Sequence, residues 1–182
     1  MDYQFKTRVY SESSLDENSI IKLSSKQSHK LVNVLRMKTS DDIIIFNNIS
    51  GEWSAKIDVN KSIVSVECIK KIRNAKKEAG PSLIFSPLKQ ARSDWLIEKA
   101  TECGVESIYP TLMKRTSVRN VNIDRYRNYA IGAAEQTGRL SIPEIQPLRK
   151  YEEQLEICEK LNKTIIFCDE LRMSPIIKEF NN

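Results

Sequence analysis

The stretch Lys89-Gln-Ala-Arg-Ser-Asp-Trp-Leu-Ile-Glu-Lys-Ala-Thr-Glu-Cys-Gly-Val105 decides the fold of this chain, together with Ala133-Ala-Glu-Gln-Thr-Gly-Arg-Leu-Ser-Ile-Pro143. In each stretch a helix-forming segment ends at glycine or proline beside charged residues. Glycine and proline end helices because glycine adopts left-handed backbone and proline cannot continue the hydrogen-bond ladder. An α/β domain presents its functional residues at such helix ends, so we expect the site there.

Short β-rich runs alternate with these helices. Ser82-Leu-Ile-Phe-Ser86 precedes a helix predicted over 93–103, Ser107-Ile-Tyr109 precedes one predicted over 122–137, and Thr164-Ile-Ile-Phe-Cys168 follows. Alternation of strand and helix predicts a parallel sheet covered by helices. We therefore expect an α/β domain in this part of the chain.

The helix predicted over 122–137 is the clearest in the chain. Apolar residues recur at steps of three and four, Asn122 can cap its start, and Gly138 marks its end. Glu135 and Arg139 stand four residues apart, so an ion pair of roughly 0.3 kcal/mol could explain both without any substrate. A local ion pair and a role in the site both remain open for Arg139.

The first part of the chain is predicted to be a small β-barrel. Asp41-Asp-Ile-Ile-Ile-Phe46 is a β-rich run before the turn-like Asn47-Asn-Ile-Ser-Gly51, and apolar residues alternate with polar ones from Trp53 and again from Val64. One helix interrupts the strands. Ser24 or Ser25 can cap its start, and Arg36 lies near its end, where the helix dipole favours a cation.

Arg73-Asn-Ala-Lys-Lys-Glu-Ala-Gly-Pro81 has no periodic apolar residues and ends in Gly-Pro, which predicts a linker. We therefore expect three parts: a β-barrel over 1–72, a linker over 73–81 and an α/β domain over 82–182.

Composition excludes several classes of protein. Hydrophobic residues make up 40% and charged residues 29%, and no apolar run approaches the ~20 residues of a membrane span. The N-terminus lacks the pattern of a secretory signal, so we expect a cytoplasmic location. The four cysteines form no C-x-x-C pair and are expected to be buried thiols, and His29 is the single histidine. We expect no metal site and no histidine-based triad.

The formal net charge is +5, and the basic residues are concentrated between positions 111 and 140. This segment contains two acidic residues, Asp124 and Glu135, and six basic ones: Lys114, Arg115, Arg119, Arg125, Arg127 and Arg139. Arginine suits phosphates and base edges, so a nucleic acid or phosphate-bearing partner is one interpretation. A solvated helix face is the other.

Arg8 and four later segments resemble the RsmE family, bacterial methyltransferases that act on N3 of a uridine in 16S ribosomal RNA. His29-Lys-Leu-Val-Asn-Val-Leu-Arg36 resembles the family's H-x-x-x-x-V-L-R, and an acidic pair follows it at positions 41 and 42. Lys89 to Val105 resembles K-x-x-r-x-e-x-x-x-x-K-a-t-E-L-G-V, with cysteine in place of the leucine. Lys114-Arg115-Thr116-Ser117 resembles E-R-S, and Ala134 to Pro143 resembles E-A-x-x-Q-s-x-R-x-x-x-P.

The resemblance implies an α/β (α+β overall) architecture with an N-terminal PUA-like barrel and a C-terminal SPOUT domain that ends in a trefoil knot. It also implies S-adenosylmethionine as the cofactor, 16S rRNA or the small ribosomal subunit as the partner, and a homodimer. The family's G-P-E-G-G stretch and its later L-G-x-R-I-L-R-x-E-T-A stretch are absent, and the chain ends at Ser174-Pro-Ile-Ile-Lys-Glu-Phe-Asn-Asn182. We therefore expect a C-terminally truncated member that lacks the knotted end, with the cofactor-binding motifs beyond Asn182.

The site residues follow from the resemblance. Methylation requires loss of the uracil N3–H proton and stabilisation of negative charge on O2 and O4, a task that suits arginine. The predicted catalytic residues are Arg139, Gln136 and Arg115. The predicted RNA-binding residues are Arg8, His29, Arg36, Lys114 and Arg119. Two alternatives are an RNA-binding remnant that cannot bind the cofactor and a silent module that only dimerises.

Overall fold

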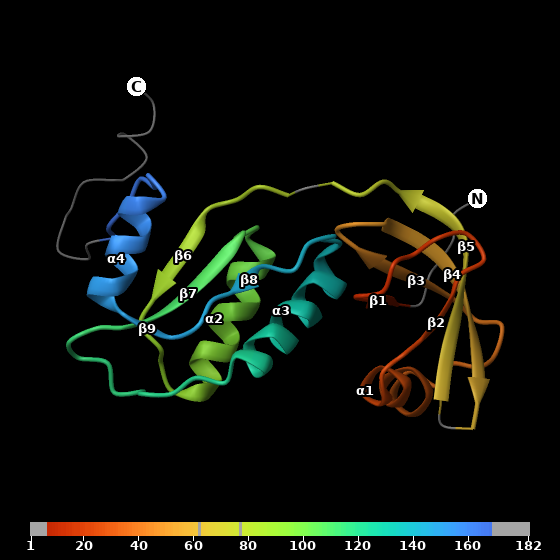
Figure 1. The fold of residues 1–182 in the computed structure, drawn as a ribbon. Coiled ribbons are helices and arrows are strands. Elements are labelled where there is room, and N and C mark those ends of the chain that lie inside the picture. Colours follow the sequence, from red (N-terminus) through yellow and green to blue (C-terminus); the bar gives the residue numbers. More distant parts are fainter. Residues whose placement is uncertain (1–6, 62, 77, 169–182) are drawn as a thin grey trace.

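The computed structural model describes residues 7–61, 63–76 and 78–168. They form an N-terminal sheet domain and a C-terminal α/β domain, which lie side by side and are joined by an extended connecting segment (Figure 1). No helix in these ranges is long and apolar enough to cross a membrane.

The sheet domain holds five strands in the order β1-β3-β4-β5-β2. β1 pairs with β3 in parallel, and the other neighbours are antiparallel. Alternate apolar side chains, including Ile43, Ile45, Ile57 and Val64, are fully buried in its core. The predicted β-rich region is confirmed as a sheet, whose strands are β1 (Arg8–Tyr10), β2 (Ile20–Lys22), β3 (Asp42–Asn47), β4 (Gly51–Asn60) and β5 (Ile63–Arg73).

The predicted helix of this domain is confirmed, and Ser24 caps it. The Ser24 side chain accepts a hydrogen bond from the Gln27 N–H, and the Gln27 side chain accepts one from the Ser24 N–H, which completes a capping box. α1 (Ser25–His29) continues directly into a π-helical turn, η1 (Lys30–Val34). Leu31 anchors this turn in the sheet core.

The α/β domain has the predicted alternation of strand and helix. β7 lies between β6 and β8 and also pairs with β9, and all three pairings are parallel. α2 and α3 pack against each other beside the sheet (Figure 1). The elements are β6 (Ser82–Phe85), α2 (Gln90–Glu102), β7 (Ser107–Leu112), α3 (Ile123–Thr137), β8 (Glu144–Ile145), β9 (Arg149–Lys150) and α4 (Tyr151–Lys160).

The strand predicted over Thr164–Cys168 is wrong. These residues have no regular structure, and Ile165, Ile166 and Phe167 are exposed by 48%, 54% and 74%. The β-propensity of such a run describes its fit to a half-buried pleated surface, and the part of the chain that the structure describes supplies no strand to cover it. The expectation about Ser174 to Asn182 lies outside the described residues.

Two of the four cysteines differ from the expectation. Cys68 and Cys158 are buried, but Cys103 and Cys168 are exposed. Burial raises the pKa of the Cys68 thiol, which keeps it protonated.

The connecting segment between the domains is extended, and close backbone contacts hold both of its ends. Gly51 has φ +87°, and a Cβ there would collide with the Arg73 carbonyl. A Cβ at Gly80 would collide with the Gly104 carbonyl. Both glycines therefore allow a backbone approach that a larger residue would prevent.

Candidate functional site

Arg8 joins the two domains at the C-terminal end of α3. Its Nε donates to Glu52 Oε1 at 2.7 Å, and its Nη1 donates to the carbonyls of Ala134 at 2.7 Å and Glu135 at 3.3 Å. Its Nη2 donates to the Arg139 carbonyl at 3.1 Å, and the guanidinium lies 4.0 Å from the centre of the Phe46 ring. Arg8 thus supplies a cation to the negative end of the helix dipole and satisfies carbonyls that the helix leaves unpaired.

Glu52 orients a second arginine toward the same helix end. Arg73 Nε lies 3.1 Å from Glu52 Oε2, and Arg73 Nη2 donates to the Gly138 carbonyl at 2.6 Å. Gly138 itself adopts the left-handed conformation that ends α3, with φ +78°. One buried carboxylate therefore holds two arginines on one helix terminus.

Arg139 donates hydrogen bonds to carbonyls at the C-terminal end of α2, as Arg8 does at the end of α3. Its Nη1 donates to the carbonyls of Thr101 at 2.7 Å and Val105 at 3.1 Å, where α2 ends, and its Nη2 donates to Ser141 Oγ at 3.0 Å. Its Nε donates to Glu78 Oε2 at 3.3 Å. The Arg139 side chain is 9% exposed, and four hydrogen bonds use most of its five N–H donors.

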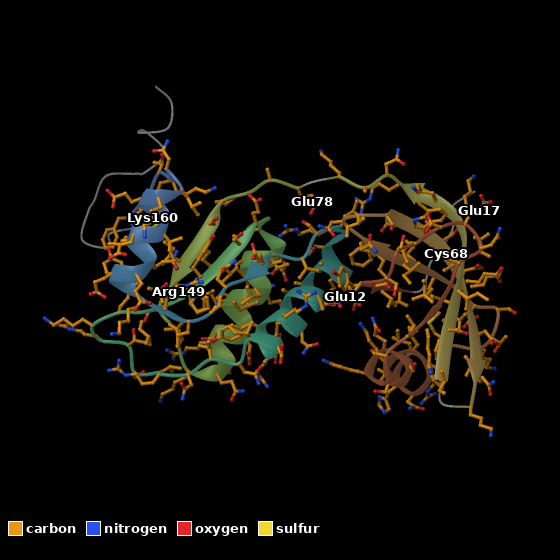
Figure 2. All side chains as sticks on the ribbon, viewed as in Figure 1. Glu12, Glu17, Cys68, Glu78, Arg149 and Lys160 are labelled. Atoms are coloured by element: carbon orange, nitrogen blue, oxygen red, sulfur yellow. The ribbon has the colours of Figure 1, made fainter. Side chains whose placement is uncertain are left out.

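Glu78 extends this network to the connecting segment, where Figure 2 labels it. It accepts hydrogen bonds from Ser141 Oγ at 2.6 Å and from the backbone N–H groups of Leu140 and Ser141 at 3.3 Å. Burial alone would raise the pKa of Glu78, but the hydrogen bonds from Ser141, Leu140 and Arg139 outweigh it and lower the pKa. The carboxylate is therefore held in its charged form.

The ion pair considered between Glu135 and Arg139 does not form. Glu135 instead accepts from Lys30 Nζ at 2.7 Å and from the Tyr10 N–H at 3.2 Å, both in the sheet domain. Arg139 points into its own domain, toward Glu78 and the end of α2. The four-residue spacing favoured a local pair. Instead, Arg139 satisfies backbone carbonyls at the end of α2, and Glu135 satisfies a lysine and a backbone N–H of the sheet domain.

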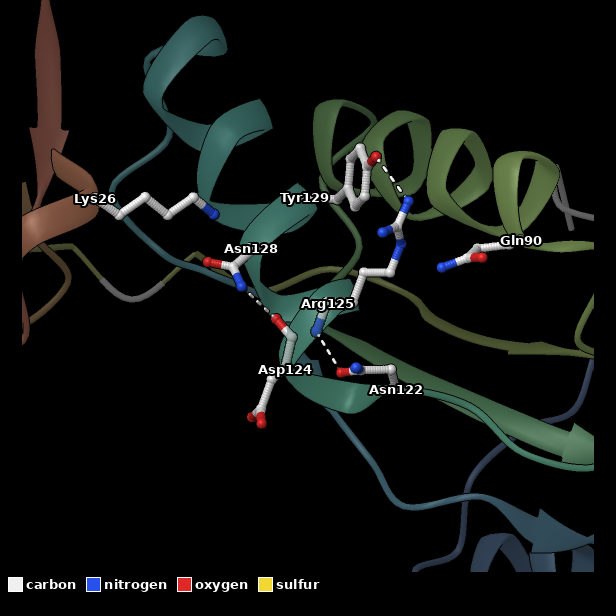
Figure 3. A pocket seen from close by; sticks show the side chains of 7 residues that line it. All are labelled: Lys26, Gln90, Asn122, Asp124, Arg125, Asn128 and Tyr129. Atoms are coloured by element: carbon white, nitrogen blue, oxygen red, sulfur yellow. Dashed lines mark hydrogen bonds between the residues drawn. The ribbon is translucent and has the colours of Figure 1, made fainter. Parts of the chain in front are cut away.

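Two polar hollows lie along α3. One of about 350 Å³ is lined from both domains and includes Arg8, Glu98 and the exposed Gln136. The other, of about 460 Å³, is lined by Lys26, Gln90 and the first turns of α3 (Figure 3). Asn128 and Tyr129 line both, so the two hollows adjoin.

Arg125 forms the wall of the larger hollow. Its Nε and Nη2 donate to the buried Asp94 carboxylate at 2.9 and 2.6 Å, and its Nη2 also reaches Tyr129 Oη at 3.2 Å (Figure 3). The hydrogen bonds from Arg125 to Asp94 raise the pKa of Arg125. Lys26 extends toward this hollow from the sheet domain and has no ion pair with any described residue.

The predicted catalytic residues lie at opposite ends of α3. Gln136 and Arg139 lie at its C-terminal end, whereas Arg115 is exposed in the loop before its start. The helix has 15 residues and is therefore roughly 22 Å long. Thr116 rather than Arg115 is buried in that loop, where its Oγ1 meets Ser86 Oγ at 2.6 Å.

The predicted RNA-binding residues also separate into groups. His29 and Arg36 are exposed on and just after the α1–η1 helix, and Lys114 and Arg119 are exposed in the loop before α3. Arg8 stands apart, because its donors face the protein interior. The roles assigned to these residues and to the catalytic set stay predictions.

Sequence reasoning missed the carboxylates that organise the junction. Glu52 is the second residue of β4, and Glu78 lies in the segment predicted as a linker. Neither belongs to a motif. Their partners lie 44 and 61 positions away, a separation that no local pattern encodes. Within the described ranges, no three His, Cys, Asp or Glu side chains gather as metal ligands do.

Comparison with known proteins places this geometry in a family. A model described as an RNA methyltransferase domain matches residues 76–182, and one described as an RNA methyltransferase PUA domain matches 23–67. Ribosomal RNA small subunit methyltransferase E of Rickettsia conorii is 32% identical over 90% of this chain and 66% of its own length. The protein of the same name from Buchnera aphidicola of Acyrthosiphon pisum is 34% identical over 88% and 66%.

A solved structure agrees in fold. The ribosomal RNA small subunit methyltransferase E of Neisseria gonorrhoeae, bound to S-adenosyl methionine, superposes with a TM-score of 0.72 at 24% identity. The match covers 82% of this chain and 64% of that one, and the chain spans slightly under two thirds of these relatives. The chain belongs to the RsmE family of RNA methyltransferases, with a PUA domain followed by a methyltransferase domain.

Proposed function

We propose that this protein takes part in methylation of N3 of a uridine in the 16S rRNA of the small ribosomal subunit, with S-adenosylmethionine as the methyl donor. The observation that carries the proposal is the order of two matched domains, one PUA and one methyltransferase, across most of the chain. The relatives, which are named ribosomal RNA small subunit methyltransferase E, support methylation of small-subunit rRNA. A cytoplasmic location, a homodimer, a closed barrel and a SPOUT-type α/β domain belong to the same proposal.

The chain's own residues are assigned RNA binding and positioning in this reaction. His29, Arg36, Lys114 and Arg119 are exposed cations or potential cations on two surfaces that flank α3, which suits contact with phosphates. Gln136 offers an exposed amide at the hollow between the domains, where it can hydrogen-bond a base edge. Arg139 holds the loop beside it and would reach O2 or O4 only after giving up hydrogen bonds to the end of α2.

Neither of the two hollows along α3 fits S-adenosylmethionine. Both hollows are lined mainly by charged and amide side chains, with no apolar slot for an adenine ring. The linings of these two hollows therefore suit RNA better than the cofactor.

The alternative to this proposal is an RNA-binding role without methyl transfer. Calorimetric titration of the chain with S-adenosylmethionine, with and without a 16S rRNA fragment, separates the two. Cofactor binding supports the methyltransferase proposal. Binding of the rRNA fragment without any heat from the cofactor supports the alternative.

A further inference from the structure

The end of β5 and the connecting segment carry a run of cations to which the proposed function assigns no role. Lys70, Lys71, Arg73, Lys76 and Lys77 occur within eight residues, and no Asp or Glu lies between Glu67 and Glu78. In the described part of the run, Lys70, Lys71 and Lys76 are exposed. These three lysines are called the basic strip.

The strip follows the end of β5, whose pairing with β4 has two register shifts, and the three residues after Arg73. Arg73, in its middle, is held by Glu52 and by the Gly138 carbonyl, and the backbone that follows crosses closely over Gly51. Residues 70 to 76 span roughly 20 Å at the rise of an extended chain. Figure 1 shows this part of the chain leaving β5 and running along the outside of the molecule toward β6.

The strip lysines lack carboxylate partners. Among the described residues, Lys70 and Lys76 form no ion pair, and the Lys71 ammonium lies 4.9 Å from the centre of the Trp53 ring. In the described part of the chain, no strand pairs with the β2 side of β5 beyond Cys68, whose backbone pairs with Asn18 and Ser19. Three cations within this short stretch repel one another, and a polyanion relieves that repulsion.

The lysines of α4 show the contrast. Lys160 lies on a helix that also carries Glu152, Glu153, Glu156 and Glu159, so its charge is surrounded by compensating carboxylates. Such a mixed surface is an ordinary solvated face. The basic strip has no such compensation.

We propose that the basic strip binds consecutive backbone phosphates of the RNA substrate. The inference rests on the proposed function for its choice of RNA. Lysine is a point charge without a planar fork, so the strip contributes affinity and orientation and does not read sequence. Because Arg73 binds the carbonyl of Gly138, RNA on the strip passes next to the loop that carries Arg139.

The test measures binding of an about 16-nucleotide fluorescein-labelled single-stranded RNA by fluorescence anisotropy between about 50 and 200 mM KCl. The strip variant is Lys70→Gln/Lys71→Gln/Lys76→Gln. The control, Lys150→Gln/Lys160→Gln/Lys163→Gln, removes the same charge from exposed positions on and beside α4. A Lys70→Gln/Lys76→Gln variant preserves the contact of Lys71 with Trp53 and guards against loss of folding.

Loss of three phosphate contacts should reduce the magnitude of the negative slope of log Kobs against log salt by about 2. It should weaken affinity on the order of 100-fold at about 0.1 M salt. The double variant should show about two thirds of that change in slope. The affinity of the control should stay within about twofold of the parent affinity. Equal slopes for the parent and both strip variants would show that the strip does not bind RNA phosphates, while RNA binding elsewhere on the protein would still stand. A parent chain without RNA affinity at low salt would remove the RNA premise and the proposed function with it.

Discussion

Replacement of Arg8 by methionine tests whether the two domains are joined through the end of α3. The substitution keeps an unbranched side chain over Phe46 but removes all four hydrogen bonds of the guanidinium. Removing one partner of a buried ion pair costs about 3–5 kcal/mol. Because Glu52 keeps Arg73, we expect a loss near the lower limit, about 3 kcal/mol in the free energy of unfolding.

Urea unfolding measures this loss, and the tryptophans report on both domains. Trp53 lies in the sheet domain and Trp95 in α2 of the α/β domain. The matched control is Arg127→Met, because its ion pair with Glu12 is exposed and is worth less than about 1 kcal/mol. If Arg8→Met and Arg127→Met cost the same small amount, Arg8 does not hold the domains together.

Three further predictions concern single residues. Glu78→Gln should remove an acid-dependent loss of stability: the folded-state pKa of Glu78 is lowered, so the parent's stabilisation is present above the unfolded pKa of about 4.3 and is lost as pH falls through the folded pKa. Identical pH profiles for variant and parent in thermal unfolding would contradict this. Gly51→Ala should cost at least about 2 kcal/mol, because φ is positive and the Arg73 carbonyl is in the way, whereas Gly132→Ala within α3 should be neutral or stabilising by about 0.5–1 kcal/mol. The reverse order in urea unfolding would show that the backbone does not approach Gly51 closely. Asp94→Asn should lower the melting temperature because it breaks a multiply hydrogen-bonded ion pair with Arg125, and an unchanged value would show that the pair contributes nothing.

Much of the fold was predictable because it is encoded locally. The capping serine at position 24, the capping Asn122 and the left-handed Gly138 are all signals that act within a few residues. Helix α4 was missed because its fully buried position is a polar residue, Gln154, which hides the apolar periodicity. The run at 164–168 was mispredicted for the opposite reason, since its composition favours a strand but no strand among the described residues pairs with it.

The site was less predictable because its contacts are long-range. Resemblance selected Arg8 for RNA binding and Arg139 for catalysis, and both roles stay predictions. The structure places both at helix ends, where their partners are carbonyls and carboxylates far away in sequence. Both motif arginines complete helix ends, a role that spacing alone cannot distinguish from substrate contact. Arg115 was grouped with them by motif, although α3 separates it from Arg139.

The most direct test of the account is incubation of the chain with S-adenosylmethionine and small ribosomal subunits that lack the modification, followed by mass spectrometry of the 16S rRNA nucleosides. The account predicts that N3-methyluridine appears, and that it appears more slowly with the strip variant. Bound but unmodified 16S rRNA would contradict the proposed reaction and leave RNA binding as the activity of this chain.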